Sequence, residues 1–223
     1  MAKFLPSRAR PGLLLAVIGT VAALLDLGGV VSGLPRLALK PVPVLALAAW
    51  VALRCRRPLG RLTAAGLVLS AVGDVLLDAG RFLAGLAAFL AAHVAYVGAF
   101  LSAERRWALG RALPFVAWGV AVFALLRTGL GTLTLPVAAY VAVITVMMWR
   151  AAARVGSPSH AGLVAWLGLA GAVAFGASDT LIAFNRFLEP IPSARVPILL
   201  LYWLGQWGIA GSAALAYRDP PNR

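Results

Sequence analysis

Long apolar runs alternate with short polar loops along almost the whole chain. A helix needs roughly 20 mostly apolar residues to cross a bilayer, and eight runs reach or approach that length. We predict helices over residues 13–31, 37–53, 62–79, 82–101, 112–126, 133–149, 161–184 and 196–217. No loop between them is long enough for a soluble domain, so we predict a single transmembrane domain over residues 1–223.

These runs predict an all-α fold, a polytopic bundle of eight transmembrane helices. The runs are continuously apolar and rich in Ala and Leu, and open sheet edges are not tolerated in lipid. Composition agrees, because 62% of the 223 residues are hydrophobic and only 12% are charged. A soluble domain carries about twice that charge. We therefore expect a multi-pass integral protein of the bacterial cytoplasmic membrane.

The net charge of +13 does not indicate a nucleic-acid partner, because the basic residues are spread from loop to loop. Fourteen of them fall in the loops and termini of one side, including Arg150 and Arg154 in one loop, and six fall on the other side. Short loops rich in Lys and Arg stay in the cytoplasm. This alternation predicts that both termini are cytoplasmic and supports the count of eight helices.

The first run has the basic start of a secretory signal peptide. It is longer than the apolar region of such peptides and lacks a clear cleavage site, so we predict a mature helix. The single cysteine, Cys55, lies in a basic loop and indicates neither an intrachain disulfide nor a cysteine-based metal site.

The sequence contains no phosphate-binding loop, HExxH motif or GxSxG motif. We therefore expect no cofactor and no bound metal, and nothing indicates an obligate protein partner. Small residues four positions apart, such as Gly168 with Ala172 and Gly208 with Ser212, are typical of closely packed membrane helices.

Polar residues inside the apolar runs are few, and ionisable groups are costly in a membrane. The set comprises Asp26, Lys40, Asp74, Asp78, His93 and Asp179, with Tyr202 and Gln206 as polar neighbours. With alternating helix directions, nearly all of them fall in the outer half of the bilayer. We therefore predict one pocket that opens toward the non-cytoplasmic side.

The segment 73–83 resembles the segment 178–188, at an offset close to half of the chain. Both contain Asp, then Arg-Phe-Leu seven positions later, and both copies run in the same direction. This pattern indicates a parallel duplication of four helices, with halves over residues 1–105 and 106–223. Coincidence in a biased sequence is the alternative.

In each copy an aspartate, Asp74 or Asp179, precedes an arginine, Arg81 or Arg186, by seven positions. Such residues share one helix face about 10 Å apart. An arginine at the interface suits a phosphate group. A carboxyl group below it in apolar surroundings favours its neutral form and can donate a proton. The alternative for each arginine is a simple interface anchor.

Three segments, residues 73–100, 177–187 and 200–210, resemble the YhhN-like lysoplasmalogenase membrane family, and Lys40-Pro41 fits the same pattern. The resemblance implies hydrolysis of the vinyl ether bond of a lysoplasmalogen or related lysophospholipid among the membrane lipids. The products would be a fatty aldehyde and a glycerophospho-headgroup.

The resemblance assigns roles to residues. Asp74 and Asp179 match the family's paired-motif aspartates, and with His93 they form the predicted catalytic set. The predicted substrate-binding residues are Lys40, Asp26, Asp78, Arg81, Asn185, Arg186, Tyr202 and Gln206. We hypothesise that one aspartate protonates the vinyl ether while the other stabilises the cation and activates water, as paired carboxylates do in glycoside hydrolysis. The sequence leaves open which aspartate is the acid.

Two alternatives remain open. Internal repeats and intramembrane polar residues also occur in transporters and lipid-binding proteins. Asp74, Asp179 and His93 could also bind a divalent cation, since carboxylate and imidazole suit several metals.

Overall fold

The computed structural model describes residues 15, 18–22, 28–29, 33–158 and 162–216. Every regular element in these ranges is helical, which confirms the all-α prediction. The α-helices are α2 (Gly33–Leu39), α3 (Val42–Arg54), α4 (Pro58–Asp78), α5 (Phe82–Ala103), α6 (Leu113–Leu126), α7 (Thr134–Ala153), α8 (Gly162–Phe187) and α9 (Arg195–Ala214). Two short 3-10 helices, η1 (Leu109–Arg111) and η2 (Gly131–Leu133), precede α6 and α7.

Seven segments of the described chain are long and apolar enough to cross a membrane. They correspond to the second through eighth predicted helices. The second combines the end of α2 with α3, and Lys40 and Pro41 lie between these two helices. The first predicted helix, 13–31, lies mostly outside the described residues, although residues 18–22 are helical.

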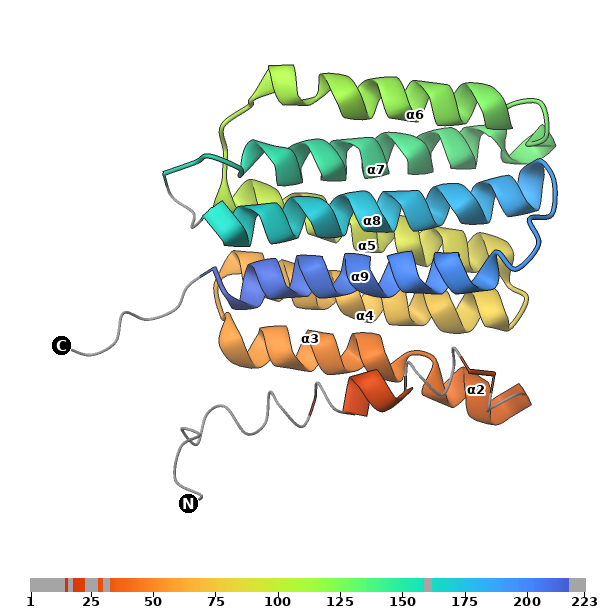
Figure 1. Ribbon diagram of the computed structural model, residues 1–223, viewed down its shortest axis with the longest axis horizontal. Coiled ribbons are helices and arrows are strands. Elements are labelled where there is room, and N and C mark those ends of the chain that lie inside the picture. Colours follow the sequence, from red (N-terminus) through yellow and green to blue (C-terminus); the bar gives the residue numbers. More distant parts are fainter. Residues whose placement is uncertain (1–14, 16–17, 23–27, 30–32, 159–161, 217–223) are drawn as a thin grey trace.

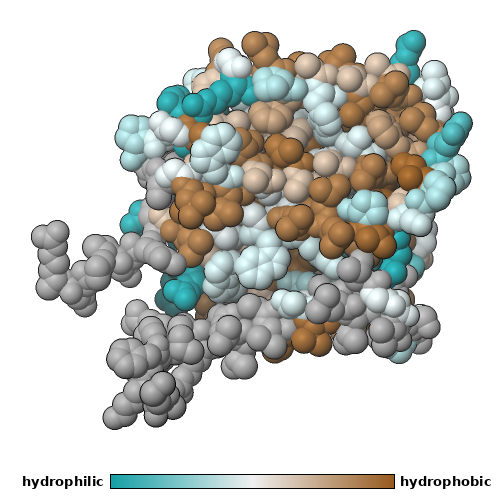
Figure 2. All heavy atoms as spheres, viewed as in Figure 1, coloured by the Kyte–Doolittle hydropathy of each residue, from teal (hydrophilic) through white to brown (hydrophobic). Residues whose placement is uncertain are grey.

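From α3 onward, α-helices that follow one another in the chain run in opposite directions through the bundle (Figure 1). The hairpins α4–α5 and α8–α9 make the most extensive helix contacts, and α4 also packs on α9 while α5 and α8 pack on α7. Helix α6 lies at one edge, against α7. Figure 2 shows hydrophilic residues gathered toward the two ends of the bundle, with apolar residues between them, as expected of a protein in a bilayer.

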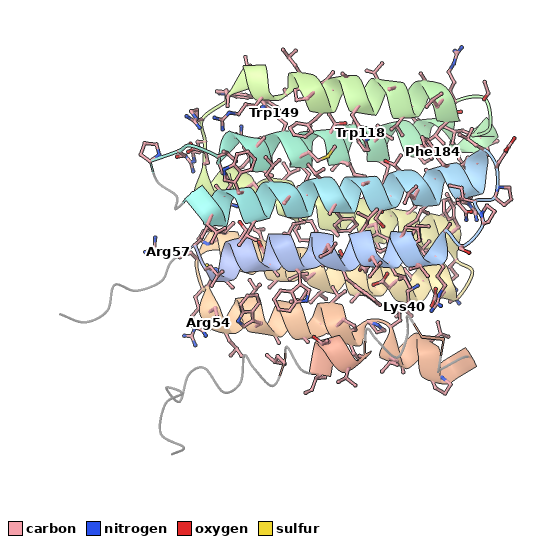
Figure 3. The ribbon with its side chains drawn as sticks, viewed as in Figure 1. Lys40, Arg54, Arg57, Trp118, Trp149 and Phe184 are labelled. Carbon is pink, nitrogen blue, oxygen red and sulfur yellow. The ribbon has the colours of Figure 1, made fainter. Side chains whose placement is uncertain are left out.

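The two ends of the bundle differ in charge. Figure 3 shows Arg54 and Arg57 at one end, which we call the basic end, and Lys40 toward the other, which we call the opposite end. The arginine-rich loops after α3 and after α5 both meet at the basic end. The loop alternation thus matches the helix directions, while the assignment of the basic end to the cytoplasm stays a prediction.

Arg150 and Arg154 lie at the basic end, but the predicted loop begins too early, because Arg150 belongs to α7 and only Arg154 follows it. Helix α7 continues to Ala153, and both arginines are buried. Arg150 donates hydrogen bonds to the backbone carbonyl groups of Glu104 and Arg106. Arg154 donates a 2.6 Å hydrogen bond to Ser212 Oγ. These hydrogen bonds join the end of α7 to neighbouring segments and give buried acceptor atoms at the basic end a donor.

Glycines bring α8 and α9 into backbone contact, as the small-residue spacing predicted. A Cβ atom on Gly171 would lie 2.6 Å from Ile209 N, and one on Gly208 would lie 2.6 Å from Gly171 Cα. Only glycine permits such an approach, which replaces side-chain packing with direct backbone contact. The register of α8 on α9, and with it the position of Asp179, is set by this contact.

Candidate functional site

A central aromatic cluster lies where α5, α7, α8 and α9 meet. It comprises Phe89, His93, Tyr96, Tyr140, Phe175 and Tyr202. The ring centroids of His93 and Phe175 lie 4.6 Å apart, and those of Phe175 and Tyr202 lie 5.3 Å apart. Helix α4 accommodates the cluster with glycine, because a Cβ on Gly73 would meet the Phe89 ring at 2.6 Å. The aromatic packing holds the polar groups described next in fixed orientations.

Asp179 on α8 forms one polar group with Tyr140 and His93. The Tyr140 hydroxyl donates a 2.9 Å hydrogen bond to Asp179 Oδ2. His93 Nε2 lies 3.5 Å from the same oxygen. The other ring nitrogen, Nδ1, lies 2.7 Å from the carbonyl oxygen of Phe89. A carbonyl oxygen only accepts, so Nδ1 carries hydrogen, and a neutral ring presents the lone pair of Nε2 to Asp179. Two lone pairs repel, so one proton shared by the pair stabilises this arrangement.

Asp74 on α4 belongs to a second polar group. The Tyr202 hydroxyl donates a 2.6 Å hydrogen bond to Asp74 Oδ2. One turn earlier, Ser70 Oγ lies 3.3 Å from the hydroxyl of Tyr96, which donates a 2.8 Å hydrogen bond to Gln206 Oε1. All of these residues are buried. The two polar groups meet at the aromatic cluster, since Tyr202 contacts Phe89 and Phe175 and His93 contacts Phe175.

An apolar pocket adjoins the Asp179 group. It is narrow, with a cavity volume of about 60 Å³. Asp179, Tyr140 and Thr180 contribute polar atoms to its wall, whereas Asp74 does not line it. The remaining lining residues are Leu77, Phe82, Leu86, Phe89, Trp118, Val122, Leu126, Val137, Val141, Ile144, Ile182, Ala183 and Phe187. Of the two aspartates, Asp179 is therefore the one placed to meet an apolar ligand in this pocket.

A second and more open hollow, which we call the vestibule, lies at the opposite end of the bundle. It is lined by Leu77, Gly80, Phe82, Ile182, Asn185 and Arg186. Leu77, Phe82 and Ile182 also line the apolar pocket, so the two spaces share a wall. The Arg186 guanidinium stacks on the Phe82 ring at 3.8 Å from its centroid. Asn185 Oδ1 accepts a 2.7 Å hydrogen bond from the backbone N–H of Ile191, which shapes the α8–α9 loop.

The remaining predicted site residues lie around this end. Lys40 Nζ pairs with Asp78 Oδ1 at 2.5 Å. Arg81 is exposed and precedes α5 directly. Asp26 lies outside the described residues. The predicted set thus divides into the Asp179 group, the Asp74 group, the Lys40–Asp78 pair and the vestibule.

A comparison with protein families identifies the family to which the chain is related. Residues 35–213, well over half of the sequence, match the model of the YhhN family. The chain belongs to the YhhN family. The matched range includes every residue of the two polar groups, the Lys40–Asp78 pair and the vestibule, which confirms the family resemblance read from the sequence motifs.

Two curated proteins illustrate the similarity. The chain is 34% identical over 90 residues to lysoplasmalogenase TMEM86B of Sus scrofa, covering 40% of this chain and 35% of that protein. It is 36% identical over 81 residues to lysoplasmalogenase TMEM86B of Homo sapiens, covering 36% of this chain and 31% of that protein. These alignments therefore span about a third of each relative. No solved structure matches the chain.

Two tyrosines of this YhhN-family site were missed in the sequence. Tyr140 and Tyr96 hydrogen bond in the Asp179 and Asp74 groups, yet neither was among the predicted site residues. Tyrosine is common at membrane interfaces, so neither position stood out. Their position well inside an apolar run, away from either helix end, was the available signal.

The metal alternative drew on Asp74, Asp179 and His93. The structure pairs His93 with Asp179, whereas Asp74 bonds to Tyr202 in the other group. Within residues 33–158 and 162–216, no three His, Cys, Asp or Glu side chains lie together as a metal site would need.

Proposed function

We propose that this YhhN-family protein is a membrane hydrolase that cleaves the vinyl ether bond of a lysoplasmalogen or a closely related lysophospholipid. The observation that carries the proposal is the Asp179–His93–Tyr140 group in the wall of an apolar pocket inside the bundle. The names of the two mammalian relatives support the substrate class. The products are a fatty aldehyde and a glycerophospho-headgroup.

The first step is proton transfer to carbon. Asp179 in its acid form donates a proton to the alkenyl carbon distal to the ether oxygen, and the double-bond electrons form the new C–H bond. Positive charge then develops on the carbon attached to oxygen and is shared with that oxygen. The Asp179 carboxylate left behind lies beside this cation and stabilises it, in surroundings where water does not screen the attraction.

The second step adds water. A water molecule attacks the cationic carbon, and its proton passes to Asp179, directly or through His93 Nε2, which restores the acid. The resulting hemiacetal loses the proton of its hydroxyl group as its bond to the glycerol oxygen breaks and that oxygen gains a proton. One water is consumed, and the enzyme ends in the protonation state in which it began.

The other groups assist without touching the reacting bond. Tyr140 holds the Asp179 carboxyl group by its hydrogen bond. Asp74, held by Tyr202, adds negative charge behind the aromatic cluster that favours the cation. Asp74 therefore acts only through its charge, and Asp179 is the acid of the predicted aspartate pair.

The headgroup is placed at the opposite end of the bundle. Arg186 borders the vestibule and Arg81 is exposed just before α5, so both can approach a phosphate from the interface. Asn185 shapes the loop beside Arg186, and the Lys40–Asp78 pair lies at the same end. Arg186 follows Asp179 by seven residues, which is about 10 Å along the helix. This separation suits a phosphate and an ether oxygen on one glycerol unit.

Aldehyde release by purified protein in liposomes tests the proposal. We expect wild type to release aldehyde from lysoplasmalogen and not from the saturated alkyl ether analogue, which has no double bond to protonate. Asp179→Asn keeps the size of the side chain but cannot donate a proton, so aldehyde release should fall by about 10²–10⁴-fold. Glu189→Gln, an exposed acid in the α8–α9 loop, is the matched control and should retain activity.

Circular dichroism and size-exclusion chromatography check that Asp179→Asn is folded. Full activity of folded Asp179→Asn would refute the acid mechanism. Uptake of intact lipid into sealed liposomes without any aldehyde would instead favour a transporter.

A further inference from the structure

Helix α6 closes one side of the apolar pocket with little support from the rest of the bundle. It packs mainly on α7, with smaller contacts to α8 and η1. Helix α5 borders the same pocket, yet α5 and α6 form no extended contact with each other within the described chain. In Figure 1, α6 lies at the edge of the bundle and α5 lies behind α8. The pocket is therefore bounded on this side by two helices that do not pack together.

The inner face of α6 is a narrow apolar stripe. Trp118, Val122 and Leu126 recur every four residues, and all three line the pocket. Figure 3 shows Trp118 between α6 and α7. On the outer face, Val120 and Leu125 are 65% and 58% exposed. A single helix therefore separates the pocket from the surrounding lipid.

Helix α5 presents a matching stripe. Phe82, Leu86 and Phe89 lie at helical spacing and line the same pocket. Leu86 is only partly buried. We call the region between the two stripes, bordered by Leu86, Trp118 and Val122, the α5–α6 seam. Its residues lie inside the two membrane spans, so hydrocarbon chains surround it.

The chemistry of the seam fits a hydrocarbon chain. Its bordering side chains carry no charge, and the hydroxyl and carboxyl groups among the lining residues belong to Tyr140 on α7 and to Asp179 and Thr180 on α8. A headgroup in the vestibule and an ether bond at Asp179 leave the chain to continue away from the vestibule. The seam borders α6, the edge helix whose outer face is exposed, so the surrounding lipid comes closest to the pocket here.

We propose that the α5–α6 seam is a lateral portal through which the hydrocarbon chain of a single-chain lipid reaches the pocket from the bilayer and in which the chain stays during the reaction. The identity of the lipid rests on the proposed function, whereas the binding of a chain at the seam does not require cleavage. The portal gives the substrate a route that never exposes its chain to water.

Photolabelling tests the portal without relying on catalysis. Wild-type protein in liposomes is irradiated with a lysophosphocholine that carries a diazirine in its chain, and the attachment sites are mapped by mass spectrometry. We expect attachment at Leu86, Trp118 and Val122 that excess unlabelled lysophosphocholine displaces. Displaceable attachment confined to other faces of the bundle or to the vestibule loops would overturn the proposal.

A matched pair of variants sharpens the test. Val122→Trp fills the seam, and Val120→Trp places the same side chain on the outer face of the same helix. Because the added indole occupies the space of the hydrocarbon chain, displaceable labelling should fall at least about tenfold in Val122→Trp. Labelling of Val120→Trp should match that of the wild type. Undiminished labelling in folded Val122→Trp would overturn the portal.

The outcomes also separate the portal from the proposed function. If Val122→Trp does not fold, the wild-type attachment map still decides between the seam and other routes. Displaceable labelling at the seam without aldehyde release from lysoplasmalogen would support the portal and refute hydrolysis. Aldehyde release with labelling elsewhere would support hydrolysis and refute the portal.

Discussion

The Tyr202 hydroxyl donates a 2.6 Å hydrogen bond to Asp74 Oδ2, joining two residues that are 128 positions apart in the sequence. Both side chains are buried, and the bond links α9 to α4. A buried carboxyl group that loses such a donor is left with part of its hydrogen-bonding capacity unsatisfied, which is more costly than removing both partners.

This relationship predicts non-additive effects on stability. Tyr202→Phe should lower the free energy of unfolding by about 1.5–3 kcal/mol, the range for hydrogen bonds to charged groups. In an Asp74→Asn background the same substitution should cost less, because the charged acceptor is already gone. Denaturation in detergent of the wild type, both single variants and the double variant measures this coupling. Strictly additive losses would show that the bond contributes nothing.

Tyr140 and Tyr96 should respond differently to loss of their hydroxyl groups. Tyr140→Phe removes the donor to Asp179 Oδ2, so turnover should fall by about tenfold, the equivalent of one hydrogen bond. Tyr96→Phe removes the bond to Gln206 and should mainly lower stability. Aldehyde release and thermal denaturation of both variants compare the two effects. Equal loss of turnover in the two variants would contradict a special role for Tyr140.

Arg186 should act on substrate affinity rather than on the chemical step. Arg186→Gln removes the charge beside the vestibule, so KM should rise about tenfold with kcat nearly unchanged. Arg127→Gln is the matched control, because Arg127 is exposed and follows α6 outside the vestibule. Steady-state kinetics with lysoplasmalogen in mixed micelles measure both constants. A fall in kcat at unchanged KM would place Arg186 in the chemistry instead.

The orientation in the membrane follows from the arginine-rich basic end. We expect Ala79→Cys, between α4 and α5, to react with a membrane-impermeant maleimide in intact spheroplasts. Gly110→Cys, in η1 at the basic end, should react only after permeabilisation. Both positions are exposed, and the substitutions are made in a Cys55→Ser background that removes the single native thiol. The reverse labelling pattern would place the basic end outside the cytoplasm.

The α8–α9 contact should tolerate no side chain at Gly171. A Cβ there would lie 2.6 Å from Ile209 N and 2.8 Å from Gly205 O, which are backbone atoms. Gly171→Ala should therefore destabilise the protein by about 1–3 kcal/mol through overpacking. Gly162→Ala, in the same helix with no atom near the added Cβ, should be neutral or slightly stabilising. Thermal denaturation of both variants decides, and equal stability would exclude a close contact.

Helix existence could be predicted from the sequence, because an apolar run of sufficient length has one stable solution in a bilayer. Helix ends were less predictable. Helix α7 runs past Trp149 to Ala153, because the charge of Arg150 is satisfied by carbonyl groups of Glu104 and Arg106 from another part of the chain. A residue that loop composition places in water is thus buried by partners that the local sequence does not reveal.

Which residues belong to the site could be predicted from the sequence better than which of them contact each other. Rare intramembrane polar residues indicated Asp74, His93, Asp179, Tyr202 and Gln206, and the structure places them around one aromatic cluster. Which aspartate borders the pocket depends on the rotation of each helix and on its neighbours. Tyr202 comes from α9 to hold Asp74, while Asp179 is held by Tyr140 from α7. Such pairings follow from the packing of helices, which the spacing along one helix does not determine.

The direct backbone contact at Gly171 also restricts the length of α8. Asp179 lies eight residues beyond that contact, and each residue of an α-helix turns the next by about 100°. Inserting or deleting one residue between the two positions would rotate the carboxyl group away from Tyr140 while leaving the hydrophobicity of the helix unchanged. Homologous chains should therefore keep the residue count of this interval constant even where residue types within it differ.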